Sequence, residues 1–365
     1  MKSVLGRRGP VVLCNCIRRF NKNVKQSEEH SRGARALRCA SGNVDSVSAG
    51  PGVGSQRGPS DRGASSSTGV VSPISSGSYY VSPAEVKGLM SSNKLSGEQL
   101  LRALIEPAGN LARPPISGFH VGALGLGGSG AIFVGVNLEF KGLALGQSVH
   151  AEQFLLANAL KHGETRLECV ALSAAPCGHC RQFYTELGCS DSIRFLFGSG
   201  PQTDFTLSEL LPHCFGPEDL LEEVGPYLLE KQSNRVRLSQ TAAGVVESRK
   251  NDSIFAAAAV KGLAEAEQCY VPYTKCPSAV ALITSTGAVA TGGCIESAAY
   301  NPTLPPLQSA IVNAIVDGMS SYDNIVEIVL LEVEGAPVSH AASIRNFIQK
   351  AAPNAKLTVL DVERC

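Results

Sequence analysis

Two short segments, His150–Ala151–Glu152 and Cys177–Gly178–His179–Cys180, restrict the fold of this 365-residue chain more than any other feature. Zinc commonly takes thiolate and imidazole ligands in proteins. A Cys-x-x-Cys pair at the start of a helix can turn both sulfurs toward one ion, and Pro176 favours such a helix start. If His150 is the third ligand, two helix starts that lie 27 residues apart must meet in space.

Glu152 indicates that this site is catalytic. Three protein ligands leave one coordination position open for water, whereas a structural zinc site usually closes with a fourth ligand. Glu152 lies two residues from His150, so it can reach that water without binding the metal and can carry protons. A Cys-x-x-Cys pair alone would fit a zinc knuckle or a redox pair, and a lone histidine would fit a core position. The combination of His150, Glu152 and the Cys177–Cys180 pair favours a catalytic zinc site. If both cysteines bind the metal, His179 is expected to point away from it.

The surrounding pattern predicts an α/β fold in which helices cover both faces of a sheet, a three-layer α/β/α arrangement. The hydrophobic periodicity predicts four helices and four strands. The helices are expected at 84–90, 97–104, 150–160 and 177–187, and the strands at 119–124, 131–136, 169–174 and 193–197.

The pattern recurs after a polar stretch near residues 222–250, which indicates a duplicated domain. Pro115–Ile116–Ser117 is similar to Pro272–Tyr273–Thr274, and Leu138–Glu139 is similar to Ile295–Glu296. Gln308 and Ala310 are expected near the places of His150 and Glu152, so the second copy has lost the chemistry. The predicted parts are an N-terminal extension (1–78), a catalytic domain (79–225), a linker (226–250) and a degenerate domain (251–365).

Charge divides the chain at the end of the predicted extension. Residues 1–78 contain twelve basic and four acidic residues, whereas residues 79–365 contain 20 basic and 28 acidic residues. The Ser-, Gly- and Arg-rich extension is expected to be disordered. It fits a plastid or mitochondrial transit peptide, a dispensable tail or a misassigned start codon. The acidic remainder argues against a nucleic-acid partner.

Two further classes of protein are disfavoured by the sequence. No apolar stretch approaches the roughly 20 residues of a membrane helix, which argues against a membrane partner. Twelve cysteines could form a disulfide framework, but nothing at the N-terminus resembles a signal peptide. In a reducing compartment most of them would be small buried residues. The cytoplasm is therefore the expected location, with an organelle as the alternative if residues 1–78 are a transit peptide.

From about Tyr79 to the C-terminus the chain resembles the cytidine deaminases, in particular their larger two-domain form in bacteria and plants. The His-x-Glu and Pro-Cys-x-x-Cys segments form the signature of zinc-dependent nucleobase deaminases. The segments that carry the resemblance are Val149–Gln153, Pro176–Phe183, Phe215–Leu220 and Asn301–Gln308.

The resemblance implies an activity and a set of site residues. A zinc-activated water would hydrolyse cytidine and 2′-deoxycytidine to uridine and 2′-deoxyuridine plus ammonia, in pyrimidine salvage. One zinc per chain would be held by His150, Cys177 and Cys180, with Glu152 catalytic. The substrate would be bound by Asn137, Glu139, Phe119 and Ala151.

The resemblance also implies a homodimer with sites near the subunit interface, where Phe215 would contribute. Several alternatives remain open at this point. Asn137 and Glu139 could be an exposed strand end, and Phe119 could be a core residue. A polynucleotide-editing deaminase would need a basic channel and stacking aromatics. A protein with only structural zinc would not need Glu152.

Overall fold

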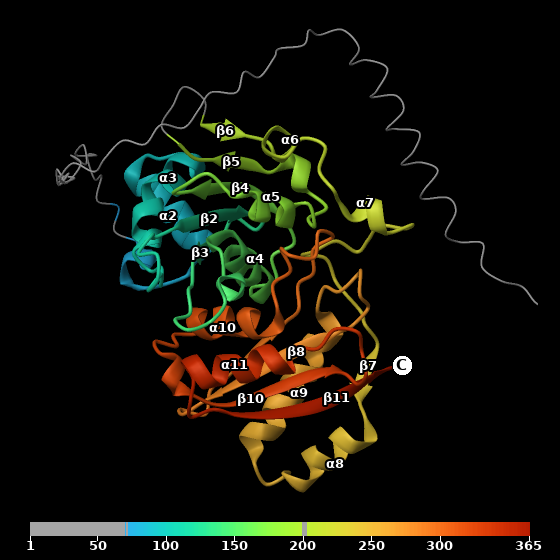
Figure 1. Ribbon diagram of the computed structural model, residues 1–365. Coiled ribbons are helices and arrows are strands. Elements are labelled where there is room, and N and C mark those ends of the chain that lie inside the picture. The colour runs from blue at the N-terminus through green and yellow to red at the C-terminus, as the bar shows by residue number, and fades with distance from the viewer. Residues whose placement is uncertain (1–69, 71, 199–202) are drawn as a thin grey trace, which may run out of the picture. The chain divides into compact units, whose positions relative to one another are not determined.

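The computed structural model describes residue 70, residues 72–198 and residues 203–365, which form two similar α/β halves (Figure 1). The expectations for residues 1–69, including a transit peptide, lie outside the described residues. Within the described part of the chain, no helix is long and apolar enough to cross a membrane.

The first half is built on a six-stranded sheet in the order β1-β3-β2-β4-β5-β6. Strands β2 and β3 form the predicted antiparallel hairpin, and β4 and β5 are parallel. The strands are β1 (Tyr80–Val81), β2 (Gly122–Gly127), β3 (Ile132–Val136), β4 (Leu167–Leu172), β5 (Arg194–Leu196) and β6 (Asp204–Phe205). The helices are η1 (Pro73–Ser76), α2 (Pro83–Asn93), α3 (Gly97–Gly109), η2 (Leu145–Gln147), α4 (Ala151–Lys161), α5 (Gly178–Tyr184), η3 (Ser190–Ser192), α6 (Leu207–Leu210) and α7 (Pro217–Leu220).

Helices cover both faces of this sheet, as predicted. A Cβ atom on Gly122 would meet the backbone of α3, whereas one on Gly125 would meet Leu155 of α4. Because these two positions are an odd number of residues apart on β2, α3 and α4 lie on opposite faces. The metal-binding motifs begin α4 and α5, which both follow strands of this sheet.

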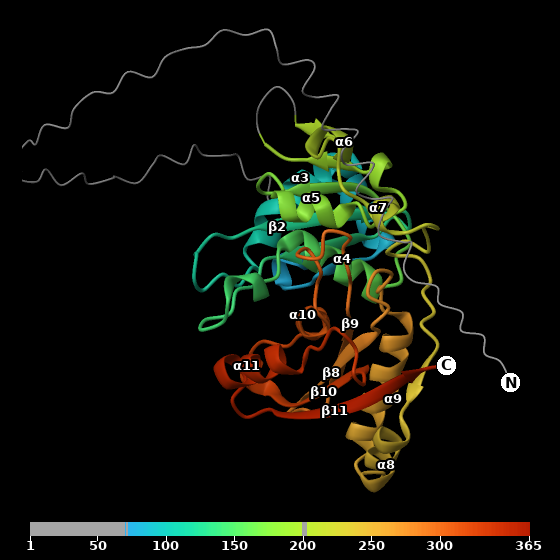
Figure 2. The ribbon, with the colours of Figure 1, turned by 45° about the vertical axis from the view of Figure 1, so that its right-hand side comes forward.

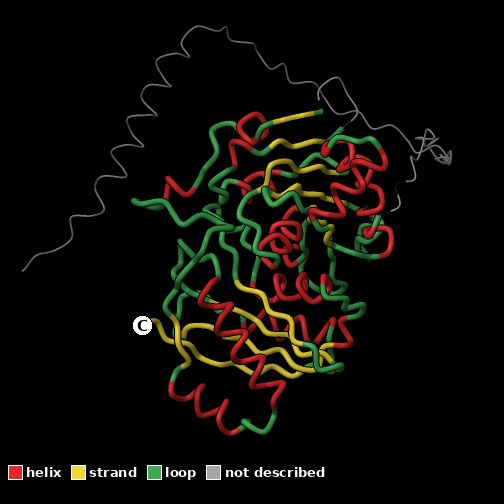
Figure 3. The backbone as a smooth tube through the Cα atoms, turned by 180° about the vertical axis from the view of Figure 1, so that it is seen from behind, coloured by secondary structure: helices red, strands yellow, loops and turns green. Residues whose placement is uncertain are grey.

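The second half repeats the same plan on a five-stranded sheet in the order β7-β11-β10-β8-β9 (Figure 3). Its strands are β7 (Val236–Leu238), β8 (Ser278–Thr284), β9 (Val289–Gly293), β10 (Ile325–Val333) and β11 (Lys356–Arg364). Its helices are α8 (Gln240–Ser248), α9 (Ser253–Gln268), α10 (Pro306–Val316), η4 (Tyr322–Asn324) and α11 (Ala341–Ala351). Strands β10 and β11 are parallel, as β4 and β5 are.

Equivalent side chains identify the register between the copies. Asn158 of α4 donates to the Val134 carbonyl of β3, and Asn313 of α10 donates to the Thr291 carbonyl of β9. On this register Pro305 and Leu307 occupy the places of His150 and Glu152, so the prediction of Gln308 and Ala310 was wrong by three residues. The loop between strand and helix accounts for two of these three residues, because it is two residues shorter in the second copy: the bridge Leu138–Val149 corresponds to Ile295–Leu304.

Two predicted boundaries also need correction. Residues 72–78 were assigned to the extension, but η1 lies here and its Ile74 is fully buried against the core. Residues 236–248 were assigned to the linker, but β7 pairs with β11 and α8 places Ala242 in the second core. Both segments are short and lie next to polar stretches, so they were not separated from the extension and the linker in the sequence.

The two halves contact each other through α4 and α10 and through loops, as the turned view in Figure 2 shows. Gln153 on α4 donates to the Pro302 carbonyl at 2.8 Å, and Gln308 on α10 donates to the Gln147 carbonyl at 3.3 Å. Gln153 and Gln308 are equivalent positions, as are Gln147 and Pro302. The copies therefore meet through a nearly two-fold arrangement, like the isologous interface of a symmetric dimer.

Candidate metal and catalytic site

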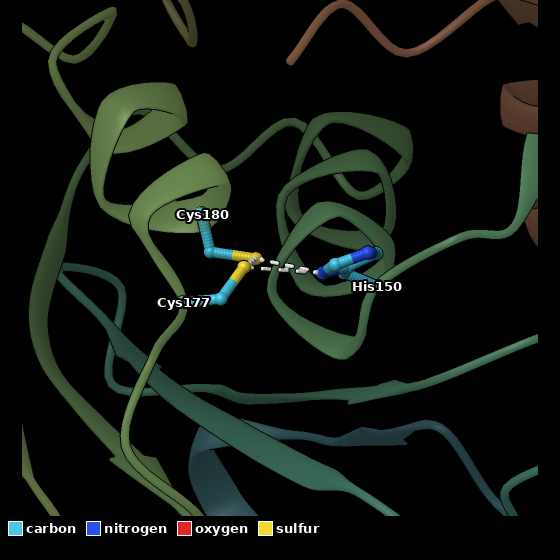
Figure 4. Close-up of side chains that lie close together, drawn as sticks. All are labelled: His150, Cys177 and Cys180. Atoms are coloured by element: carbon cyan, nitrogen blue, oxygen red, sulfur yellow. Dashed lines mark hydrogen bonds between the residues drawn. The ribbon is translucent and has the colours of Figure 1, made fainter. Parts of the chain in front are cut away.

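The structure brings His150, Cys177 and Cys180 together, as the sequence predicts (Figure 4). His150 is the residue immediately before α4, and Cys177 is the residue immediately before α5. Cys180 follows one turn later on α5 and is fully buried. Two helix starts therefore supply all three groups, and among the described residues this is the one His/Cys/Asp/Glu group whose ligand atoms lie within 4.8 Å of one another.

The distances in this group are within about 0.2 Å of those expected around a tetrahedral zinc ion. Zinc–sulfur and zinc–nitrogen bonds of about 2.3 and 2.0–2.1 Å place neighbouring ligand atoms about 3.5–3.8 Å apart at a tetrahedral angle. The two Sγ atoms are 3.6 Å apart, and His150 Nδ1 is 3.5 Å from Cys177 Sγ and 3.3 Å from Cys180 Sγ. The donor set and its spacing therefore suit zinc, with a fourth position left for water.

Electrostatics at the group favour a deprotonated thiol. Hydrogen bonds from Cys180 and His150 lower the pKa of the Cys177 thiol to about 3. The hydrogen bond to Cys177, followed by burial, raises the pKa of the Cys180 thiol. The hydrogen bond to Cys177 also raises the pKa of His150. The lowered pKa of Cys177 favours the thiolate form, which is the form that binds a soft cation.

Glu152 lies beside the group on the first turn of α4 and is 5% exposed. Burial raises the pKa of its carboxyl. A carboxylate whose pKa is raised by burial is a stronger base than one in water, and so is better suited to accept and return a proton. His179 is not part of the metal group, and its Nε2 donates to the Asn301 carbonyl at 2.6 Å.

A cavity of about 360 Å³ opens onto this group. Four of the predicted substrate residues, Phe119, Asn137, Glu139 and Ala151, line it together with His150 and Glu152. Five further lining residues were not predicted from the sequence as site residues: Val121, Leu138, Leu145, Ser148 and Val149. Ser117 also lines the cavity. A larger cavity of about 720 Å³ along β9 and α9 contains none of the metal-group residues.

Asn137 and Glu139 hold the loop that carries Phe119. The Asn137 side chain accepts from Val121 N and donates to the Phe119 carbonyl, both at 2.9 Å. Glu139 accepts from Ile116 N at 2.8 Å, from Ser117 N at 2.9 Å and from Ser117 Oγ at 2.6 Å. Partial burial opposes ionisation, but these hydrogen bonds outweigh it and lower the pKa of Glu139. Glu139 is therefore an anion at the wall of the cavity.

Phe119 is 62% exposed at this wall, so it is not the core residue that the sequence left open. An exposed aromatic ring beside a cavity offers a face on which a flat heterocycle can stack. Ala151 is buried at the first position of α4, between the ligand His150 and the acid Glu152.

Comparison with known proteins agrees with this geometry. Models described as the cytidine and deoxycytidylate deaminase zinc-binding region match residues 96–195 and residues 207–345. Cytidine deaminase 1 of Arabidopsis thaliana is 39% identical over 296 residues, covering 77% of this chain and 97% of the relative. A cytidine deaminase of Vibrio atlanticus is 34% identical over 283 residues, covering 77% of this chain and 89% of the relative.

A solved cytidine deaminase from Mycobacterium tuberculosis is 31% identical and covers 32% of this chain and 95% of its own, with a TM-score of 0.29. The two matched models fall one on each half of the duplicated fold, and the metal group lies in the first. The chain belongs to the cytidine deaminase family.

Proposed function

We propose that the protein hydrolyses the exocyclic amine of cytidine and 2′-deoxycytidine, producing uridine or 2′-deoxyuridine and ammonia. The observation that supports this proposal most directly is that one cavity brings together the metal group, an acid and two polar side chains. Glu152 is buried beside a three-ligand metal group at one part of the wall, and Asn137 and Glu139 line another part.

His150, Cys177 and Cys180 would hold the zinc. When bound, zinc supplies Lewis-acid chemistry that lowers the pKa of a water molecule to about neutral. Glu152 accepts a proton from the attacking water and delivers protons to N3 of the pyrimidine and to the amine that leaves as ammonia. Water supplies the oxygen atom of the product, so the reaction is a hydrolysis and needs no redox partner.

The remaining wall residues orient the nucleoside. A carboxylate and an amide can accept from and donate to the hydroxyls of a sugar, and Glu139 and Asn137 supply both groups. Phe119 stacks on the pyrimidine, and the backbone of Ala151 contacts the base. These roles place the amine-bearing carbon near Glu152 and leave the sugar at Glu139.

An exposed aromatic residue bears on the protein partner, and the free cysteines bear on the cellular location. Phe215 is 44% exposed, and Gln182 of α5 donates to its backbone carbonyl, which holds this residue beside the helix that carries Cys180. We propose that it packs against a second copy in a homodimer. The nine described cysteines are all free, which suits a reducing compartment, and we propose the cytoplasm. The segment before η1 would redirect the protein if it were a transit peptide.

One assay separates this function from its alternatives. Purified full-length protein is given cytidine, deoxycytidine, CMP, cytosine and a short cytosine-containing oligonucleotide, and kcat/KM is measured for each. The two nucleosides should have the highest values. A higher kcat/KM for CMP or for the oligonucleotide would contradict the nucleoside assignment and leave the metal site intact.

A further inference from the structure

Two consecutive carbonyls in the second copy contact the two helix starts that carry the metal ligands. The Pro302 carbonyl accepts from Gln153 on α4, and the Asn301 carbonyl accepts from His179 on α5. Both belong to the segment 299–303, which lies between β9 and α10 and which we call the 299–303 turn. One backbone segment outside the catalytic half thus contacts both helices at whose starts the metal group lies.

Gln153 connects this turn to a ligand. Its Oε1 accepts from the backbone N–H of His150 at 3.1 Å while its Nε2 donates to Pro302. The side chain is 2% exposed, so both polar atoms depend on these partners. The side-chain amide of Gln153 therefore links the backbone of His150 to the Pro302 carbonyl of the second copy.

His179 makes the corresponding connection on the other helix. It lies between Cys177 and Cys180 in the first turn of α5. A carbonyl oxygen can only accept, so His179 Nε2 carries the proton of its 2.6 Å bond to Asn301. This contact holds the start of α5 at the same turn that holds α4.

The 299–303 turn is itself held on both sides. Thr303 N donates to the Tyr300 carbonyl, and Ile295 exchanges two backbone hydrogen bonds with Leu304 next to the turn. Ala298 N donates to the buried carboxylate of Glu186, which lies just beyond α5. The two acceptors therefore cannot move independently of each other.

We propose that Gln153 and His179 are positioning residues, through which the 299–303 turn sets the spacing between His150 and the Cys177–Cys180 pair. The inference rests on the zinc site that the proposed function uses, but it assigns a role to the degenerate copy. Groups that orient metal ligands from behind typically change metal affinity or activity by about 10–100-fold when removed.

The test compares three substitutions in the full chain with one matched control. Gln153→Leu and His179→Leu remove the two contacts, and His179→Gln restores a side-chain donor. Gln308→Leu removes the equivalent amide in the second copy, whose acceptor Gln147 is separated from His150 by the Leu138–Val149 bridge. The measurements are the rate of zinc transfer to a chelator, kcat and KM for cytidine, and the melting temperature.

We expect Gln153→Leu and His179→Leu to release zinc about 10–100-fold faster and to lower kcat with little change in KM. His179→Gln should recover much of the loss. Gln308→Leu should lower the melting temperature while releasing zinc at the wild-type rate. If Gln153→Leu does not fold, the two His179 variants still test the proposal, because His179 is only half-buried and its substitution disturbs the core less.

Wild-type zinc release in both Leu variants would overturn the proposal. Equal acceleration by Gln308→Leu would also overturn it, because the contacts would then serve only the stability of the joint. Zinc release needs no substrate, so failure of the proposed nucleoside activity would leave this measurement unaffected.

Discussion

Glu139 and Glu296 accept the same three hydrogen bonds in the two copies. Glu139 binds Ile116 N, Ser117 N and Ser117 Oγ, and Glu296 binds the equivalent Tyr273 N, Thr274 N and Thr274 Oγ1. The second copy has no metal ligands, yet it keeps this carboxylate. The glutamate therefore holds the preceding loop in both copies, and contact with a sugar is the additional role that we propose for it in the first.

The pair provides a matched test of that additional role. Glu139→Gln should lower kcat/KM for cytidine about 10–100-fold, because a hydrogen bond to a charged group contributes about 1.5–3 kcal/mol. Zinc content should stay at one per chain. Glu296→Gln should keep the kcat/KM of wild type, since it is remote from the cavity. Equal losses in the two variants would contradict a role for Glu139 that is specific to the cavity.

Glu152 is expected to carry the protons of the reaction. Glu152→Gln should reduce kcat by at least about 10²–10⁴-fold, because general acid–base catalysis contributes on this scale and one residue serves several steps. The side chain keeps its size, so zinc content and melting temperature should match those of wild type. The decrease in ultraviolet absorbance as cytidine becomes uridine measures turnover. Near-normal turnover would rule out the mechanism.

The metal group should lose zinc when any ligand is removed. His150→Ala and Cys180→Ala should each abolish zinc retention and activity together, because each removes one of three anchors. Cys214→Ala serves as the control, since Cys214 is an exposed free thiol outside the group. Metal analysis should find one zinc per wild-type chain, and two would contradict the loss of ligands in the second copy.

Gly135 and Gly292 are equivalent glycines where a strand approaches a helix backbone. A Cβ at Gly135 would lie 2.0 Å from the Ala151 carbonyl oxygen, and one at Gly292 would lie 2.1 Å from Ala310 N. Gly135→Ala and Gly292→Ala should each lower the free energy of unfolding by about 1–3 kcal/mol or more. Gly135→Ala should also lower kcat, because it displaces the start of α4 between His150 and Glu152. Similar kcat values for the two variants would contradict this.

Glu186 predicts a pH effect on stability. It is fully buried, and it accepts from Tyr270 Oη, Tyr273 Oη and Ala298 N of the second copy. Burial raises the pKa of its carboxyl against the effect of these hydrogen bonds. The folded state therefore binds this proton more tightly than the unfolded state, so its stabilising effect decreases as pH rises from about 4.3 through the raised value.

Urea unfolding of wild type and Glu186→Gln over this range isolates the effect. The free energy of unfolding of wild type minus that of the variant should fall with rising pH, by at most about 1.4 kcal/mol per pH unit. Above the raised pKa the difference should become constant. A difference that is independent of pH throughout would show that Glu186 titrates normally.

The sequence predicted the parts of this structure that depend on local pattern. The order of strands and helices around His150 and Cys177 was predicted correctly, because buried strands and helix starts leave periodic and motif signals. The meeting of His150 with Cys177 and Cys180 followed from zinc chemistry, and the structure confirms it.

Tertiary contacts between the copies were not predictable in the same way. Gln153 was visible only as part of a motif, and its bond to Pro302 joins residues 149 positions apart. Most of the error in placing Gln308 and Ala310 comes from a loop shortened by two residues, which leaves the strands similar and shifts the helix. A clue to Gln153 was present in the repeat, since Gln308 stands at the equivalent place without a histidine to serve.

The contacts that the 299–303 turn makes with Gln153 and His179 use backbone oxygens only. Almost any residue supplies such an oxygen, so side chains in this turn can drift without removing either acceptor. An insertion or deletion is different, because it would carry both carbonyls away from their donors at once. The half of the protein that has lost its ligands is thus constrained at this point in length more than in composition.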